Sequence, residues 1–171
     1  LIVRAAAEAG EIARSFWRGD PEVWWKGSSP VSEADFASDA HLRKVLLGAR
    51  PHYGWISEET AARPADGGEE RFFVVDPIDG TRAFLRGETT WCVSVAVIAG
   101  GRPVAGVLDA PALGEVFTAT ADGPALLNGR PIAVSARETD GDLLVSMPDT
   151  MRRRLERDRA PGLAFASQVP S

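Results

Sequence analysis

The sequence predicts an α+β fold in which two helices precede a mostly antiparallel sheet. Apolar residues recur at helical spacing in the first fifty residues, and after residue 90 the apolar period shortens to two. Glycine-containing turns separate the later apolar runs, and sequential hairpins of this kind favour antiparallel pairing. We therefore expect a layered arrangement of helices against a sheet.

The first helix is predicted over residues 1–17. Its apolar residues recur three and four positions apart and so share one face; they are Ile2, Ala5, Ala6, Ala9, Ile12, Ala13 and Phe16. Residues 18–30, "RGDPEVWWKGSSP", are dense in Gly, Pro and Ser. Such a segment predicts a break between the first helix and the second.

The second helix is predicted over residues 32–51. Ser32 is followed three residues later by Asp35, a pattern that resembles a capping box with Asp in place of Glu. Pro51 is expected to end the helix. Its apolar face is predicted to hold Phe36, Leu42, Val45, Leu46 and Ala49.

Strands are predicted from residue 53 onward. A short strand is predicted for "YGWISEET", which ends in polar residues. A loop is predicted for "ARPADGGEE". Residues 71–75, "RFFVV", show little alternation and are expected to be buried on both faces. Two strands around a Gly-Gly turn are predicted within 91–111, and further strands within 114–135, where Asn128-Gly129 is a strong hairpin signal. A last helix is predicted to start near Pro148 or Asp149.

Composition is typical of a soluble globular protein and predicts one domain over residues 1–171. The chain is 44% hydrophobic and 25% charged, and its net charge of −5 argues against a general nucleic-acid binder. The single cysteine, Cys92, excludes an intrachain disulfide and favours a reducing, cytoplasmic compartment. We expect Cys92 to be a small buried hydrophobe rather than a nucleophile. No apolar run reaches transmembrane length.

The stretch "FFVVDPIDGTRAF" places two carboxylates, Asp76 and Asp79, at the end of an apolar strand. A charge there costs several kcal/mol unless it is paired. Either the two residues cap a turn, or they hold a cation. A turn alone would account for Asp79 but not for Asp76, nor for Glu58 and Glu59 at the end of another apolar strand. Oxygen ligands of this kind suit a hard cation such as Mg²⁺.

The residues between and after the two aspartates add further groups. Pro77 fixes φ and removes a donor, which stiffens the turn and leaves the Ile78 carbonyl able to face the same cation. Gly80 and Thr81 are expected to open a short helical segment whose N–H groups could seat a phosphate. The spacing does not match an EF-hand, a P-loop or the D-x-D-G-T pattern of haloacid dehalogenase phosphatases.

Taken with "SPVSEADFASD" and "WISEET", the "DPIDGTRAF" motif resembles the inositol monophosphatase family over nearly the whole chain. The resemblance implies an α-β-α-β-α sandwich and a Mg²⁺-dependent, Li⁺-sensitive phosphatase. It also implies that Glu58, Asp76, Asp79 and the Ile78 carbonyl are metal ligands. The metal would lower the pKa of the attacking water and neutralise charge on the leaving oxygen.

The same resemblance assigns roles to the neighbouring residues. Glu58 and Thr81 would orient and activate the water, and Asp35 would bond to the Thr81 hydroxyl. Phosphate would be bound by Asp79 together with the Gly80 and Thr81 amides. Lys26 corresponds to a mobile-loop lysine near the metals, although a solvated lysine is an equal alternative. Glu59 is expected to support the site or lie on the surface, and His41 and His52 are expected to be surface or packing residues.

The chain departs from the family pattern in one respect. The family's later W-D-x-A-A-G motif, whose Asp completes a metal site, has no counterpart, because no Trp-Asp pair occurs in the sequence. The first residue is Leu1 rather than Met, and "FASQVPS" ends about where the family's second half begins. Two interpretations follow: a phosphatase seen in part, with the C-terminal part of the family fold missing, or a non-catalytic fragment that binds a metal or a partner.

The predicted partners are a small-molecule phosphate monoester and a second copy of the chain in a homodimer, with no nucleic acid polymer and no membrane. "WISEE" and "DPEVWWK" look closer to bacterial 3′(2′),5′-bisphosphate nucleotidases than to inositol phosphatases, where the matching stretch more often reads "GEE". Adenosine 3′,5′-bisphosphate is therefore the first substrate prediction. Inositol 1-phosphate and histidinol phosphate are the alternatives, because "DPIDGTRAF" also occurs in enzymes that act on them.

Overall fold

The computed structural model describes residues 1–66, 70–134, 136, 143–145, 151, 153–154 and 163–165. These residues form an α+β structure, as predicted. Contacts divide the chain into two compact units, Leu1–Ala133 and Val134–Ser171. In the second unit β10 (Leu143–Val145) and β11 (Leu163–Phe165) pair in parallel. The single domain over 1–171 stays a prediction, and the start of the last helix at 148–149 lies outside the described residues.

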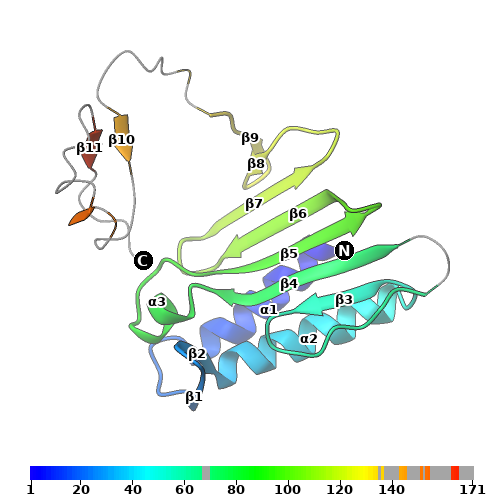
Figure 1. Ribbon diagram of the computed structural model, residues 1–171, viewed down its shortest axis with the longest axis horizontal. Helices are drawn as coiled ribbons and strands as arrows, with labels where there is room; N and C mark the ends of the chain where they lie inside the picture. The colour runs from blue at the N-terminus through cyan, green and yellow to red at the C-terminus, as the bar shows by residue number, and fades with distance from the viewer. Residues whose placement is uncertain are drawn as a thin grey trace. The chain divides into compact units, whose positions relative to one another are not determined.

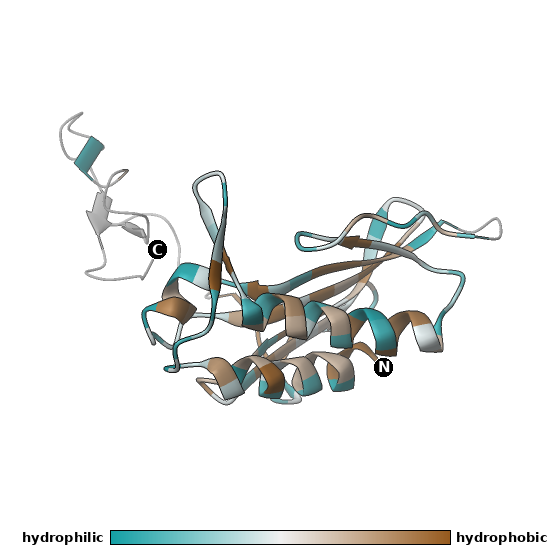
Figure 2. Cartoon of the chain, turned by 90° about the horizontal axis from the view of Figure 1, so that it is seen from below, coloured by the Kyte–Doolittle hydropathy of each residue, from teal (hydrophilic) through white to brown (hydrophobic). Residues whose placement is uncertain are grey.

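Two helices make one layer of the first unit (Figure 1). The helix α1 (Ile2–Phe16) packs on α2 (Glu33–Ala49), and both lie on one face of the sheet. Small residues line the buried side of α1 and allow close approach; they are Ala5, Ala6, Ala9, Gly10 and Ala13. Figure 2 shows the two helices side by side, each with hydrophilic and hydrophobic faces. The predicted first helix is confirmed to within one residue at each end.

The second helix begins with the capping box that the sequence predicts. The Ser32 backbone N–H and hydroxyl donate to Asp35 Oδ2 at 2.8 and 2.6 Å, and the Ser32 side chain in turn caps the Asp35 backbone. On the predicted apolar face, Leu42 and Leu46 are fully buried. Phe36, which packs on Trp24, and Ala49, the last residue of the helix, are exposed.

The sheet has seven strands in the order β3-β4-β5-β6-β7-β8-β9. The pair β3 (Gly54–Ser57) and β4 (Arg71–Asp79) is parallel, and every later pair is antiparallel. The long strands β5 (Cys92–Ala99) and β6 (Arg102–Ala110) meet at the predicted Gly-Gly turn. They are followed by β7 (Glu115–Thr120), β8 (Leu126–Leu127) and β9 (Arg130–Pro131). Asn128 and Gly129 have φ of 49° and 76°, as a tight hairpin requires.

The main core lies between the helices and the sheet. It includes Leu42, Trp55 and Phe73, none of which is more than 1% exposed. Complete burial of a large apolar side chain stabilises a fold by roughly 1.5–3 kcal/mol. The burial of residues 71–75 on both faces was wrong: Phe73 and Val75 are buried, whereas the alternate residues are half-buried. The reason is that, in the described part of the chain, α1 and α2 cover only one face of the sheet.

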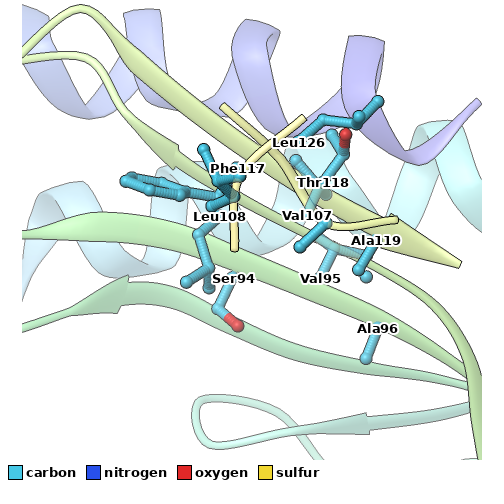
Figure 3. A pocket seen from close by; sticks show the side chains of 12 residues that line it. Ser94, Val95, Ala96, Val107, Leu108, Phe117, Thr118, Ala119 and Leu126 are labelled. Carbon is cyan, nitrogen blue, oxygen red and sulfur yellow. The ribbon is translucent and has the colours of Figure 1, made fainter. Parts of the chain in front are cut away.

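The other face of the sheet bears a shallow apolar hollow of about 310 Å³ (Figure 3). Side chains from β5, β6 and β7 line it, among them Ala96, Leu108 and Phe117. Leu108 is 41% exposed, so this surface is open to solvent among the described residues. The polar residues of the candidate site do not line the hollow.

The predicted break between the two helices is present, and it contains a hairpin that the sequence does not predict. Strands β1 (Val23–Lys26) and β2 (Ser29–Ser32) pair antiparallel around Gly27, which has φ of 62°. Trp24 packs edge-to-face on Phe36 at 5.5 Å between ring centroids. Aromatic residues favour strands, and that preference prevails over the Gly and Ser content of the turn. The hairpin reaches the end of β3, where the candidate site lies.

Candidate active site

The site lies where the parallel strands β3 and β4 end. The register pairs Ser57 with Val75, so Glu58 follows β3 beside Asp76 of β4. Parallel pairing of neighbouring strands therefore brings these two acids, 18 residues apart in sequence, to one edge of the sheet. Asp76 is half-buried and Glu58 is exposed. The juxtaposition that the sequence predicts for the two strand ends is thus present.

A bulge in β4 determines how the "DPID" segment faces. Asp76 pairs with Ser94 and Asp79 pairs with Cys92, so β4 uses one residue more than β5 over this interval. The extra residue places Pro77 and Ile78 both in the interior, and leaves Asp76 half-buried and Asp79 exposed. In a regular strand, residues three apart would face opposite sides. The bulge therefore allows Asp76 and Asp79 to serve one site.

The Asp76 carboxylate also stabilises the turn. Its Oδ1 accepts a hydrogen bond from the Ile78 backbone N–H at 3.2 Å. A turn function was expected for Asp79 rather than for Asp76, and the structure assigns it to Asp76. This bond does not remove the cost of the charge, because burial and the negative charges of Glu58 and Asp79 raise the pKa of Asp76 to about 7.

This electrostatic coupling identifies the acidic cluster, which we define as Glu58, Asp76 and Asp79. Within the described residues, no three acidic, His or Cys side chains are placed so that they could hold a metal ion as they stand. Burial, and after it the charges of Glu58 and Asp79, nevertheless disfavour ionisation of Asp76. Carboxylate oxygens fit a hard divalent cation, so the donor set fits Mg²⁺ in kind. The assignment of individual ligands stays a prediction.

Thr81 and Asp35 are in contact, as the resemblance implies. The Thr81 hydroxyl lies 3.3 Å from Asp35 Oδ1 and 3.0 Å from the Ile78 carbonyl oxygen, so its single proton is shared between two acceptors. Asp35 is 1% exposed, and burial raises its pKa while hydrogen bonds from Ser32 oppose that effect. The contact joins the start of α2 to the start of α3 (Thr81–Leu85). A role of this pair in activating water stays a prediction.

Gly80 is required by its surroundings at the start of α3. Its φ of 91° is left-handed, and an added Cβ would lie 2.7 Å from the Thr90 carbonyl oxygen. A small core supports the turn from below, made of Ala13, Ala34, Ile78, Phe84 and Trp91. The backbone N–H groups of Gly80 and Thr81 are thus held by a rigid frame at the edge of the acidic cluster. Their predicted use as a phosphate seat remains untested.

Lys26, on the β1–β2 hairpin, contacts the segment Glu58–Glu59 after β3, which we call the acidic loop. Its Nζ donates to the Glu58 carbonyl oxygen at 2.9 Å and forms an ion pair with the Glu59 carboxylate. The Glu59 side chain is only 8% exposed, in keeping with a supporting position. Two alternatives were predicted for Lys26: a contact near the site or a freely solvated side chain. The structure favours the contact.

The remaining predicted assignments concern Cys92, His41 and His52. Cys92 is half-exposed, not buried, because it faces the side of the sheet that the helices leave open. Burial and the charges of Asp79 and Asp76 raise the pKa of its thiol to about 12, which disfavours a nucleophilic thiolate. His41 bonds to Glu8 at 2.9 Å on the helix surface, and His52 is exposed. Both histidines are surface residues, as expected.

Sequence reasoning missed two residues beside the acidic loop, Asp39 and Ser57. The Ser57 hydroxyl donates to Asp39 Oδ1 at 2.5 Å and accepts the Glu59 backbone N–H at 3.1 Å. Asp39 is 1% exposed, which is rare for an aspartate. The only sequence signal was its position four residues after Asp35, on the same helix face.

We expect the stability of the metal-free protein to fall as pH rises, because of Asp76. Its pKa of about 7 in the folded state lies above its ordinary value of about 4 in the unfolded chain. The folded state therefore holds the proton more tightly, and this contribution to stability is full below the ordinary pKa and is lost as pH rises through about 7. Asp76→Asn should unfold at higher urea than wild type at pH 8 and not at pH 4.

The matched control for this prediction is Asp122→Asn, at an exposed position in the turn after β7. It should keep the pH dependence of the wild type. Urea titrations between pH 4 and pH 8 in the presence of a chelator measure both variants. If the stability of Asp76→Asn followed that of wild type at every pH, the raised pKa of Asp76 would be wrong.

Comparisons with known proteins identify relatives of this chain. A sequence model of the inositol monophosphatase family matches residues 1–165. The chain is 36% identical over 148 residues to the inositol-1-monophosphatase of Rhizobium meliloti, which covers 85% of this chain and 55% of that protein. It is 34% identical over 138 residues to the histidinol-phosphatase of Chlorobaculum parvum, covering 80% and 52%. The chain spans about half the length of the curated relatives it matches.

Solved structures agree with the sequence comparison. The crystal structure of the extragenic suppressor protein suhB from Bartonella henselae matches with a TM-score of 0.86 and 31% identity, covering 96% of this chain and 67% of that chain. The described helices and seven-stranded sheet are thus in agreement with the fold of such a neighbour. The family model extends over both strand ends of the acidic cluster. The chain therefore belongs to the inositol monophosphatase family.

Proposed function

We propose that this chain is the N-terminal part, or the whole, of a Mg²⁺-dependent phosphomonoesterase that hydrolyses a small phosphorylated metabolite. The observation that supports this most is the acidic cluster, where burial and the charges of Glu58 and Asp79 raise the pKa of Asp76 to about 7. Perturbed acids at the edge of a sheet favour a functional site. Family membership supports the reaction class, and the Rhizobium meliloti and Chlorobaculum parvum relatives are named phosphatases.

The residues that would hold Mg²⁺ are Glu58, Asp76, Asp79 and the Ile78 carbonyl. The carbonyl oxygen has two lone pairs, so it can accept the Thr81 hydroxyl and still face a cation. When bound there, Mg²⁺ would lower the pKa of a water and offset negative charge on the leaving oxygen. Occupancy would also relieve the mutual repulsion that Asp76 shows.

The chain's own residues would position the reactants. Thr81, held by Asp35, and Glu58 would orient the attacking water from two sides. The Gly80 and Thr81 amides, with Asp79, lie at the turn where the phosphate is proposed to bind. Lys26 would keep the acidic loop in place through its bonds to Glu58 and Glu59. No covalent intermediate on the protein is proposed.

A second function of a different class is a non-catalytic domain that binds a metal or partner through the same cluster. It remains the alternative because no three acidic, His or Cys side chains of the described residues are placed to hold a metal ion as they stand. The intact mass of the purified protein separates the two. A mass near the 18.3 kDa of this sequence favours the binding domain, and a clearly larger one favours the enzyme.

Two substrates are proposed within the phosphatase class. Adenosine 3′,5′-bisphosphate is the prediction from "WISEE" and "DPEVWWK", and it stays a prediction. Inositol 1-phosphate is supported by the name of the Rhizobium meliloti relative, and histidinol phosphate by that of the Chlorobaculum parvum relative. A homodimer, cytoplasmic location and Li⁺ sensitivity are also proposals. In the described part of the chain no helix is long and apolar enough to cross a membrane.

An assay panel tests the proposal. Phosphate release is measured from adenosine 3′,5′-bisphosphate, inositol 1-phosphate, fructose 1,6-bisphosphate and histidinol phosphate with Mg²⁺, with chelator and with added Li⁺. We expect Mg²⁺-dependent release from at least one substrate, and the ratio of kcat/KM values selects among them. Saturable Mg²⁺ binding by calorimetry with no release from any of the four would favour the binding domain.

A further inference from the structure

One face of α2 presents two buried carboxylates to the two chain segments that form the candidate site. Asp35 and Asp39 are separated by one helical turn, and each is 1% exposed. Asp35 contacts Thr81 at the start of α3, whereas Asp39 contacts Ser57 at the end of β3. Residues four apart lie one above the other on a helix. A single rigid element therefore contacts both sides of the acidic cluster.

The Ser57 hydroxyl connects Asp39 to the backbone on the far side of Glu58. A hydroxyl can donate one hydrogen bond and accept others. Ser57 Oγ donates to Asp39 Oδ1 at 2.5 Å and accepts the Glu59 backbone N–H at 3.1 Å. The Glu58 side chain is exposed, so the position of its carboxylate depends on where these neighbouring anchors hold the backbone.

Asp39 is an unusual choice for a purely structural position. Its second oxygen, Oδ2, is buried and has no hydrogen-bond partner among the described residues. A buried polar atom without a partner is destabilising, and each such atom in a folded protein calls for an explanation. The bond that the other oxygen of this side chain accepts from Ser57 gives one, because it joins the helix to the end of β3.

We propose that Asp39 is a positioning residue that acts through Ser57. The Asp39–Ser57 pair fixes the Glu58–Glu59 segment, and Asp35 fixes Thr81, so that α2 sets the distance between the two groups proposed to orient the water. The expected effects on Mg²⁺ affinity and on kcat rest on the proposed function. The anchoring of the loop is a property of the metal-free protein and is tested separately.

Amide hydrogen exchange of Glu59 in the metal-free protein tests the anchoring. Ser57→Ala deletes the acceptor of the Glu59 N–H and should accelerate its exchange about tenfold or more, because exchange reports local opening. Asp39→Ala should have the same effect through loss of the bond that holds Ser57. Asp39→Asn keeps a carbonyl oxygen that can accept from Ser57, so it should stay near wild type. Ser57→Thr keeps the hydroxyl and should do likewise.

The matched control is Ser38→Ala on the same helix. Ser38 is fully buried, and its hydroxyl donates to the Ala9 carbonyl at 3.3 Å, away from the acidic loop. This variant should leave Glu59 exchange unchanged even if it lowers global stability. A loss of stability from any buried polar deletion is thereby separated from a specific release of the loop.

Mg²⁺ affinity by calorimetry, and kcat where the protein turns over, test the consequence. Residues that orient metal-binding groups typically contribute 10- to 100-fold to affinity or activity, so Ser57→Ala and Asp39→Ala should each weaken Mg²⁺ binding about tenfold. The double variant should be no worse than either single variant, because both act through one hydroxyl. KM should change less than kcat.

Several outcomes would overturn the proposal. Unchanged Glu59 exchange in Ser57→Ala would mean that the hydroxyl does not anchor the loop. Fully additive effects in the double variant would mean that Asp39 and Ser57 act independently. Faster exchange with unaltered Mg²⁺ affinity would confine the pair to loop stability and remove its positioning role. If Asp39→Ala does not fold, Ser57→Ala compared with Ser57→Thr decides. Failure of the proposed function would appear as a wild-type protein that neither binds Mg²⁺ nor turns over, and it would leave the amide-exchange result unaffected.

Discussion

Asp79→Asn is expected to abolish most phosphatase activity while the fold stays intact. The substitution is nearly isosteric and removes one charge from the acidic cluster. A metal that polarises a phosphoryl oxygen contributes several kcal/mol of transition-state stabilisation, so loss of a ligand should lower kcat by about 10²-fold or more. Asp79 is exposed at the end of β4, where it pairs with Cys92, and the amide can occupy the same place without a clash.

The stability of the metal-free Asp79→Asn protein should hold or rise. The charge of Asp79 is one of the causes that raise the pKa of Asp76. Its removal lessens the repulsion within the cluster, so Asp76 should ionise at a lower pH and the folded state should lose less stability as pH rises. Activity and stability are therefore expected to change in opposite directions, which a simple folding defect would not produce.

Steady-state kinetics at saturating Mg²⁺ and urea unfolding with chelator measure the two effects on the same preparations. Asp122→Asn, on an exposed turn, is the control and should leave both unchanged. If Asp79→Asn bound Mg²⁺ and turned over like wild type, Asp79 would be a turn residue only, and the metal ligands of the site would have to be sought elsewhere.

The helices and the later strands could be predicted because their signals are local. Ser32 and Asp35 stand three apart at the start of α2, and the reciprocal capping bonds that this spacing predicts are present. Asn128-Gly129 predicts a tight hairpin because few other residues accept positive φ at both positions. The hairpin β1–β2 was missed because its strands are short and its turn residues dominate the composition of the segment.

Tertiary features of the candidate site could be predicted only in part. Glu58 and Asp76 each end an apolar run in the sequence, and the parallel pairing of β3 with β4, which the sequence does not reveal, brings them to one edge of the sheet. The bulge that turns both Pro77 and Ile78 inward cannot be recognised from the spacing of polar residues in the sequence. The bond between Asp39 and Ser57 joins residues 18 apart on different elements. From the sequence alone, a single aspartate on a helix is expected to be a solvated residue.

Thr81→Val is expected to lower kcat by about 10²-fold with little change in KM. Valine keeps the backbone N–H that is proposed to seat phosphate and has nearly the volume of threonine. It removes the hydroxyl that lies 3.3 Å from Asp35 and 3.0 Å from the Ile78 carbonyl. A group that orients the nucleophile acts mainly in the transition state, and deletion of one such positioned group typically costs about 10²-fold or more in rate.

Asp35→Asn should show a milder kinetic defect of the same kind. The amide can still present its oxygen to Thr81, but its NH₂ group then faces the two Ser32 donors that Asp35 Oδ2 now accepts. Loss of this cap should lower the free energy of unfolding by about 1 kcal/mol. Thr81→Val leaves the Ser32 bonds intact, so comparison of the two variants separates the capping function of Asp35 from its contact with the hydroxyl.

The double variant Thr81→Val/Asp35→Asn should be less impaired than the product of the two single defects predicts. Both residues are proposed to act on one water, and groups that act as a unit are not additive. Steady-state kinetics on the full-length protein at saturating Mg²⁺ measures this coupling. A Thr81→Val enzyme with normal kcat and raised KM would mean that the hydroxyl only binds substrate, because an interaction equal in the ground and transition states changes KM alone. The water-activating role of Thr81 and Asp35 would then have to be abandoned, while the acidic cluster would keep its proposed role in binding Mg²⁺.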